Sequence, residues 1–242
     1  MINSFTAVDI ETTGLDPLTE RIIEIGAVKV VNGKTAAGFS QLINPGRPLT
    51  ERIINLTGIR DDMLREAPDA EGVLEAFLDF AGEDILLGHN ILFDYSFLKR
   101  YYAGMKISYA RRGIDTLAIA RMFHNDLESR SLTSMCRYYR IDNRHAHRAL
   151  DDAAAARDLY FKMAEQFYEA KEAPFLPREL IFRVKKEEPI TRRQKNYLLD
   201  LMKCHKIEAQ SILDGKESVD CLTKSEASKK IDSIIYHFGR IL

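Results

Sequence analysis

An Asn-Gly dipeptide between two β-rich segments constrains the fold of this chain more than any other feature. The first segment, from Arg21 to Val31, is rich in β-branched residues, and the second runs from Thr35 to Ile43. Asn32-Gly33 separates them, and Asn-Gly between apolar runs is a strong signal for a tight hairpin turn. An apolar-polar alternation that begins at Phe5 predicts another strand ahead of the hairpin. The chain is therefore expected to open with three antiparallel strands.

Strands and helices alternate after this meander. We expect short helical turns over 50–65, helices over 70–81, about 92–103, 116–123, 132–139 and 149 to about 172, and short strands over 84–90 and 113–115. Hairpin strands followed by strand–helix alternation predict an α/β domain, in which a mixed sheet is covered by helices.

The C-terminal quarter has a different character. Pro174, Pro177 and a charged run that ends at Pro189 predict a connector. Amphipathic helices follow, and Thr223-x-x-Glu226 matches a capping box. We therefore expect a main domain over residues 1–173, a linker over 174–190 and a small helical module over 191–242. So small a module buries little apolar surface, so we expect it to dock on the main domain or on a partner.

The composition predicts a cytoplasmic protein. The chain has 242 residues, of which 45% are hydrophobic, enough for one full-sized domain and a small appendage. No apolar run approaches the ~20 residues that span a bilayer. The N-terminus lacks the basic and apolar regions of a secretory signal, and the three cysteines are far apart, as expected of reduced thiols. No membrane association is expected.

Charge is distributed unevenly along the chain. Basic residues outnumber acidic ones by eleven to four between Tyr95 and Leu150, and by fourteen to ten from Phe175 to Leu242, whereas the remainder is strongly acidic. Basic regions beside an acidic cluster are typical of a protein that binds a polyanion and chelates metal where it reacts.

Two acidic residues lie at the end of the first expected strand. Asp9 and Glu11 are two residues apart, so their side chains project from the same face of the strand. Adjacent carboxylates repel each other unless a cation lies between them. Hard divalent cations such as Mg²⁺ take oxygen ligands, so this pair is a candidate metal site.

Two further motifs contain acidic residues. Asp94, in His89-Asn90-x-x-Phe93-Asp94, lies in the first turns of an expected helix, where the helix dipole favours negative charge. In the helix expected over 149 to about 172, Asp152 falls on the apolar face, whereas Asp151 falls on the face expected to meet water. A carboxylate on an apolar face needs a partner or a metal. His147 precedes this helix and can accept a proton near neutral pH, with His145 as the alternative base.

Taken in order, these motifs resemble one family. Asp9-x-Glu11-Thr12-Thr13-Gly14, His89-Asn90-x-x-Phe93-Asp94 and His147-x-x-x-x-Asp152 are similar to the DEDDh group of DnaQ-like 3′→5′ exonucleases, which includes the proofreading epsilon subunit of bacterial DNA polymerase III. The resemblance covers roughly residues 3–172 and departs from the pattern at none of these positions. It implies a ribonuclease H-like fold with a mixed sheet.

The resemblance also implies a chemistry. Asp9, Glu11, Asp94 and Asp152 would hold two Mg²⁺ ions, for which Mn²⁺ would substitute, and His147 would take a proton from the attacking water. The product would be a nucleoside 5′-monophosphate. The residues implied to meet the terminal nucleotide are Thr12, Thr13, Gly14, Leu15, His89, Asn90 and Phe93. Leu15 and Phe93 can instead be ordinary core residues.

Three functions are compatible with these patterns. The first is a 3′→5′ exonuclease that acts on single-stranded or frayed 3′ ends of DNA, alone or with a DNA polymerase or another replication or repair protein. The second is an exoribonuclease of the same fold, which would differ in how its site treats the 2′-OH. The third is a non-catalytic module that binds nucleic acid or tethers a polymerase. The C-terminal helices would grip the substrate strand, dock a partner or only stabilise the main domain; the candidate gripping residues are Arg192, Arg193, Lys195, Lys229 and Lys230.

Overall fold

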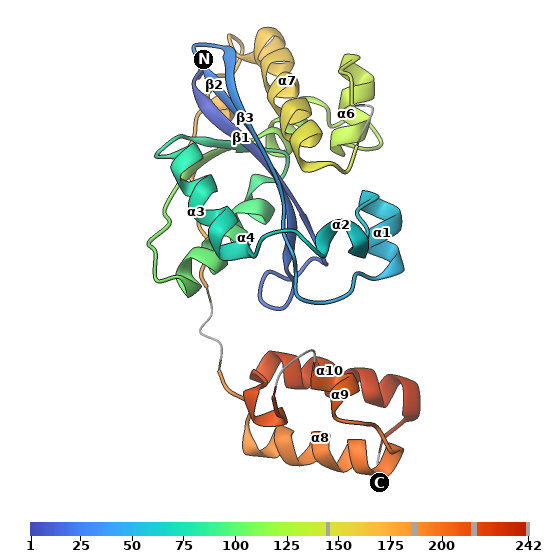
Figure 1. The fold of residues 1–242 in the computed structure, drawn as a ribbon. Helices are drawn as coiled ribbons and strands as arrows, with labels where there is room; N and C mark the ends of the chain where they lie inside the picture. Colours follow the sequence, from blue (N-terminus) through green and yellow to red (C-terminus); the bar gives the residue numbers. More distant parts are fainter. Residues whose placement is uncertain (144–145, 185–187, 214–216, 241–242) are drawn as a thin grey trace. The chain divides into compact units, whose positions relative to one another are not determined.

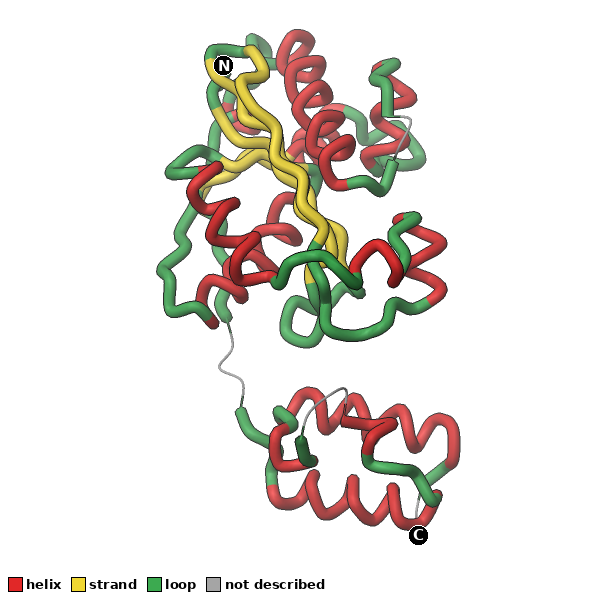
Figure 2. Tube along the Cα trace, viewed as in Figure 1, coloured by secondary structure: helices red, strands yellow, loops and turns green. Residues whose placement is uncertain are grey.

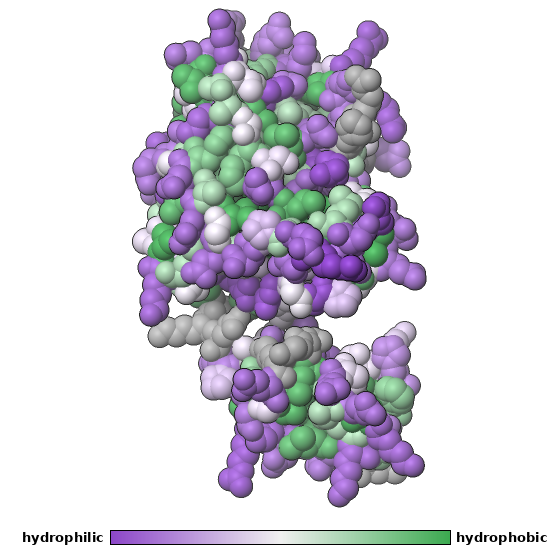
Figure 3. Space-filling model, viewed as in Figure 1, coloured by the Kyte–Doolittle hydropathy of each residue, from purple (hydrophilic) through white to green (hydrophobic). Residues whose placement is uncertain are grey.

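The chain forms two compact units in the computed structural model (Figure 1). The structure describes residues 1–143, 146–184, 188–213 and 217–240, so the alternative base His145 lies outside the described residues. The units are Met1–Val184 and Lys185–Leu242. No helix among the described residues is long and apolar enough to cross a membrane. On the visible faces, hydrophilic side chains surround smaller apolar patches (Figure 3).

The first unit is built on a six-stranded mixed sheet (Figure 2). Its strands are β1 (Phe5–Thr12), β2 (Ile22–Val31), β3 (Lys34–Leu42), β4 (Leu86–Gly88), β5 (Arg112–Asp115) and β6 (Arg178–Glu179), in the order β3-β2-β1-β4-β5-β6. The first three pair antiparallel, and β1, β4 and β5 pair parallel. Asn32 and Gly33 both have left-handed backbone angles, as a tight hairpin turn requires. The predicted mixed α/β sheet is confirmed.

Strand β6 falls in the segment expected to be a linker. It pairs antiparallel with β5, and the Leu180 amide donates to the Arg111 carbonyl oxygen at 2.9 Å. A strand of two residues is too short to produce a period-two pattern, so the sequence alone does not reveal it. The start of the expected linker therefore completes the sheet, whereas the limits of the independently folding domains stay a prediction.

Helices cover both faces of the sheet (Figure 1). They are α1 (Glu51–Thr57), α2 (Asp61–Leu64), α3 (Ala70–Ala81), α4 (Ile91–Gly104), α5 (Thr116–Phe123), α6 (Leu132–Tyr139), α7 (Ala149–Phe167) and the 3-10 turn Ala173–Phe175. Alternate β1 residues point to opposite cores. Val8 and Ile10 pack in the core formed with α3 and α4, whereas Phe5 and Ala7 pack in the core formed with α5 and α7. Because Asp9 and Glu11 continue the Phe5–Ala7 alternation, they face α7.

The second unit has its own small core. It contains α8 (Arg192–His205), α9 (Gln210–Leu213), the 3-10 turn Val219–Cys221 and α10 (Lys224–Phe238). The buried apolar residues of these elements form one cluster: Leu198, Leu201, Met202, Ile212, Leu213, Val219, Leu222, Ile231 and Ile234. The capping box predicted at Thr223 and Glu226 is present at the start of α10. Docking of this unit on another surface stays a prediction.

Candidate active site

Asp9 and Glu11 lie side by side with two residues of β2. Asp9 is in register with Gly26, and Glu11 is in register with Glu24. Cross-strand partners present their side chains on the same face of a sheet, so this end of the face carries three carboxylates and one glycine. Asp9 and Glu11 are half-buried, whereas Glu24 is 1% exposed.

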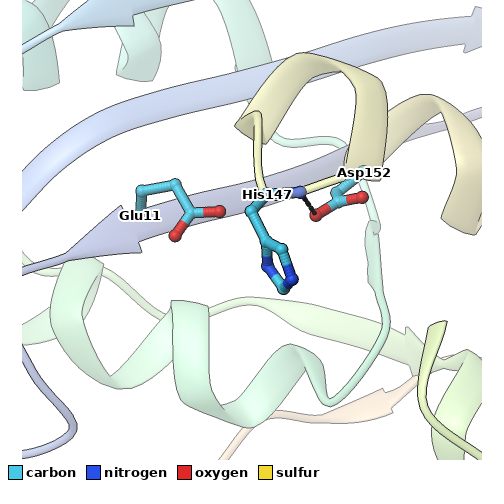
Figure 4. A group of neighbouring side chains, drawn as sticks. All are labelled: Glu11, His147 and Asp152. Atoms are coloured by element: carbon cyan, nitrogen blue, oxygen red, sulfur yellow. Dashed lines mark hydrogen bonds between the residues drawn. The ribbon is translucent and has the colours of Figure 1, made fainter. Parts of the chain in front are cut away.

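The start of α7 brings a further carboxylate and a histidine to the same place. One ligand atom each of Glu11, His147 and Asp152 lie within 4.8 Å of one another, and Figure 4 shows the three side chains together. Asp152 is buried, and its Oδ2 accepts a hydrogen bond from the His147 amide at 3.0 Å. Asn143 Nδ2 donates to the other Asp152 oxygen at 2.8 Å. The imidazole of His147 is exposed, so a water or substrate can reach it.

Asp94 approaches from the opposite side of the sheet. It is 3% exposed in the first turn of α4, and its Oδ1 accepts a hydrogen bond from the Ile10 amide at 3.0 Å. Ile10 lies between Asp9 and Glu11, so this bond fixes Asp94 against the acidic end of β1. Asp9 and Asp94 are outside the tight group of three, although both contribute to the same electrostatic cluster.

Burial and the neighbouring carboxylates raise the pKa values of these acids. Burial raises the pKa of Asp9 well above its usual value, and Asp94, Asp152 and Glu11 raise it further. Burial also raises the pKa of Glu11 to about 8, with added repulsion from Asp152 and Glu24. For Asp94, burial raises the pKa to about 8, although backbone hydrogen bonds oppose the change. A divalent cation would relieve this repulsion, and a set of carboxylate oxygens suits Mg²⁺ or Mn²⁺.

The turn after β1 is held by polar contacts that leave one apolar side chain exposed. Thr12 Oγ1 donates to the Gly14 carbonyl oxygen and Thr13 Oγ1 donates to Glu20, both at 2.7 Å. Arg47 contacts both Thr13 and Glu20. Leu15, which follows, is 80% exposed. It is therefore not a core residue, and it is free to contact a nucleotide.

The residues expected near the terminal nucleotide at the start of α4 differ in how available they are. Both ring nitrogens of His89 already have protein partners, Thr116 Oγ1 at 2.9 Å and the Arg130 carbonyl oxygen at 2.8 Å, and burial lowers its pKa. Asn90 is exposed, in a left-handed conformation. Phe93 is partly buried beside the core, where its ring lies 5.1 Å from that of Phe97. Substrate contacts by these residues stay a prediction.

Sequence reasoning missed Glu24, Gly26 and Arg148. Both oxygens of the Glu24 carboxylate accept hydrogen bonds from residues at the start of α7, the Arg148 side chain and the Ala149 amide. The available signal is a lone acidic residue in the apolar run of β2, followed two positions later by glycine on the same face. Its partner is 124 residues away in the chain, so no local pattern identifies it.

Known proteins are similar to about two thirds of this chain. The family model described as Exonuclease matches residues 6–160. The PolC-type DNA polymerase III of Caldanaerobacter subterraneus subsp. tengcongensis is 38% identical over 165 residues, and that of Bacillus subtilis is 39% identical over 162 residues. These segments cover 68% and 66% of this chain but only 12% and 11% of the two polymerases. The chain thus spans a small fraction of these relatives.

Solved structures with the same fold include two that are named as nucleases. The nuclease domain of 3′hExo, a DEDDh family member bound to rAMP, aligns with a TM-score of 0.61 and 21% identity over 74% of this chain and 98% of its own. Exonuclease X in complex with 5′ overhanging duplex DNA aligns with a TM-score of 0.55 and 23% identity over 67% and 92%. The Mg²⁺- and Mn²⁺-bound form of S. pombe Pop2p aligns with a TM-score of 0.56 and 13% identity over 69% and 84%. The sheet is thus of the ribonuclease H-like type, and because the family model matches more than half of the sequence, the chain belongs to the exonuclease family as a DnaQ-like member.

Proposed function

We propose that the first unit is a metal-dependent 3′→5′ exonuclease that releases nucleoside 5′-monophosphates from DNA ends. The observation that carries this proposal is the convergence of Asp9, Glu11, Asp94 and Asp152 on one end of β1, with His147 exposed beside them. Buried carboxylates that lie close to one another are unfavourable in a purely structural role. Shifted pKa values of this kind are typical of functional sites.

Each side chain has a separate task in this reaction. The four carboxylates supply the oxygen ligands for two divalent cations, Mg²⁺ or its substitute Mn²⁺. When bound, these cations lower the pKa of a water and stabilise the charge on the leaving oxygen. His147 accepts the proton of the attacking water, because its ring is exposed next to Glu11 and Asp152. The water oxygen bonds to the terminal phosphorus, and the bond to the 3′ oxygen of the preceding nucleotide breaks.

The similarity to known proteins supports DNA as the substrate of this chain. The chain is more than a third identical to segments of two polymerases that make DNA, and one structural neighbour is bound to duplex DNA. A single-stranded or frayed 3′ end is the form of DNA that we propose enters the site, where Thr12, Thr13, Gly14 and Leu15 meet its terminal nucleotide. Proofreading, repair or end trimming, together with a DNA polymerase or another replication protein, is the corresponding role. The cytoplasmic location stays a prediction.

An exoribonuclease is the second candidate, because one structural neighbour is bound to rAMP. The two substrates differ at the 2′-OH, which is what lets a protein distinguish RNA from DNA at a given site.

Digestion of matched oligonucleotides tests both candidates. Single-stranded DNA, duplex DNA and RNA labelled at the 5′ end are incubated with the full chain, with Mg²⁺ or with EDTA. A ladder that shortens from the 3′ end, depends on Mg²⁺ and is faster on DNA supports the proposal, whereas faster digestion of RNA selects the second candidate.

Adjacent residues of α7 provide a matched pair of variants for the same assay. Asp152→Asn is expected to abolish digestion while the chain stays folded, and Asp151→Asn, one position earlier on a more exposed face, is expected to preserve it. Equal activity of the two variants would disprove the assignment of Asp152 as a ligand.

A further inference from the structure

We propose that Glu24 and Arg148 are positioning residues, which hold the start of α7, and with it His147 and Asp152, against the acidic end of β1. This inference rests on the proposed exonuclease function, because it assigns His147 and Asp152 to the reaction. Glu24 lies outside the motifs that carry the chemistry, and Arg148 occupies an unspecified position between His147 and Asp152.

The contacts of Glu24 act on the first residues of α7. Its carboxylate is 1% exposed, and Arg148 Nη2 donates to Oε1 at 2.8 Å. Arg148 Nε lies 3.2 Å from both oxygens, and the Ala149 amide donates to Oε2 at 3.1 Å. A guanidinium that engages both oxygens of a carboxylate fixes their relative orientation as well as their distance.

Glu24 also replaces a local helix cap. The first amides of a helix have no partner within the helix, and the side chain of the preceding residue usually accepts from one of them. Arg148 occupies that position in α7 and makes no such bond. Glu24 accepts the Ala149 amide instead, so the helix begins only where β2 presents its carboxylate.

Gly26 allows the start of α7 to lie very close to β2. A Cβ atom at Gly26 would lie 2.0 Å from Leu150 N and 2.1 Å from the Ala149 carbonyl carbon. The backbone of α7 therefore rests directly on the backbone of β2, opposite Asp9 in the strand register. Together, Gly26 and Glu24 fix both the depth and the direction of the first turn.

This arrangement reaches the reacting groups through adjacent backbone. His147 precedes Arg148, and its φ of 68° is in the left-handed region that residues with a Cβ seldom adopt. The His147 amide in turn donates to Asp152. A backbone in an uncommon conformation persists only where its surroundings hold it. Fixing Arg148 therefore fixes the base and the neighbouring carboxylate together.

Arg148 has a second effect on the acidic cluster. Glu24 is in register with Glu11, so an unpaired Glu24 would add a fourth negative charge beside Asp9, Glu11 and the Asp152 of α7. The positive charge of Arg148 offsets it. The pair thus contributes position without adding net charge to the site.

Glu24→Gln in the full chain tests the proposal. Glutamine keeps an oxygen for the Ala149 amide but loses the ion pair with Arg148. We expect kcat on single-stranded DNA to fall about 10–100-fold, as is typical when the partners that orient reacting or metal-binding groups are removed, with KM within about twofold. Arg148→Lys keeps the positive charge but loses the guanidinium that contacts both carboxylate oxygens, so its kcat is expected to fall less than that of Glu24→Gln.

Arg157→Gln is the matched control. It lies about two turns further along the same helix, where it pairs with Asp158 and contacts Thr35. Its kcat is expected to equal that of the parent. If Glu24→Gln fails to fold, Arg148→Lys, whose side chain is 41% exposed, carries the test by itself.

Hydrogen exchange gives a readout that does not depend on activity. Loss of protection confined to the amides of 149–152 in Glu24→Gln supports the positioning role, even if the parent chain digests no substrate and the proposed function fails. Folded variants that keep kcat within twofold of the parent, or an unchanged exchange pattern at 149–152 in Glu24→Gln, would overturn it.

Discussion

Replacing Gly26 by alanine should damage the site far more than the size of a methyl group suggests. The new Cβ would lie 2.0 Å from Leu150 N, whereas unbonded atoms prefer about 3.5–4.0 Å, so strand and helix must separate by roughly 1.5 Å. Forcing one extra carbon into a packed interface typically costs about 1–3 kcal/mol. For a unit of this size, that lowers Tm by about 2–12 °C.

The effect on catalysis should exceed the effect on stability. A displacement of about 1 Å between reacting groups can cost about 10²-fold in rate. Because the start of α7 carries His147 and Asp152, we expect Gly26→Ala to lower kcat by about that factor at temperatures where the variant is fully folded. Circular dichroism gives Tm, and initial rates on a labelled single strand give kcat.

A glycine in the next strand supplies the control. A Cβ at Gly38 in β3 would lie 4.0 Å from Leu150 Cδ1, an ordinary contact with the same helix residue. Gly38→Ala should therefore leave kcat unchanged and Tm equal or slightly higher, since alanine restricts the unfolded chain. If Gly26→Ala and Gly38→Ala have equal kcat and equal Tm, the close approach of α7 is not the reason that position 26 requires glycine.

Three further predictions concern the proposed base, the cation and the exposed turn. His147→Ala should lower the rate near pH 7 by about 10²–10⁴-fold, the usual contribution of a positioned base, and an unchanged initial rate would remove His147 from that role. Without divalent cation, Tm should fall as the pH rises from about 4.5 to 8. Burial raises the pKa of Glu11 to about 8, so in this range the folded state holds a proton that the unfolded state releases. Mg²⁺ should accordingly raise Tm more at pH 8 than at pH 6 in thermal shift measurements, and this dependence on pH should be smaller in Glu11→Gln. The same dependence in the variant and the parent would contradict the assignment of Glu11 as a ligand of the cation. Leu15→Ala should leave Tm unchanged because the side chain is 80% exposed. It should raise KM about fivefold if the nucleotide buries part of the leucine, because that burial contributes about 1 kcal/mol to binding. An unchanged KM would show that no nucleotide covers Leu15.

Local patterns predicted the elements that local interactions determine. The limits of α5 and α6 agree with the sequence prediction, because Asp115 and Ser131 cap them from adjacent positions. The left-handed turn at Asn32 and Gly33 likewise needs only its own residues. Strand β6 was missed because its two residues are ordered by pairing with β5, not by any pattern of their own.

The same distinction applies to the candidate site. Helical periodicity separated buried Asp152 from Asp151 without any knowledge of the sheet. The position of Glu24 beneath the start of α7 depends on the register of β1 with β2 and on how closely α7 packs. Neither quantity is contained in a short stretch of sequence. The sequence therefore predicts which residues carry charge, whereas the structure supplies the residues that hold them.

Close packing and charge repulsion oppose each other at this site, and the sequence of α7 shows how both are accommodated. The helix is rich in small side chains where it crosses the sheet: Ala149, Ala153 and Ala156 are buried. Small side chains on the helix and Gly26 on the strand allow an approach that larger residues would prevent. That approach brings Asp152 next to Glu11, which is unfavourable until a cation binds. Helix packing therefore compensates for the repulsion in the absence of metal, and a change that loosens this contact should weaken both stability and cation binding.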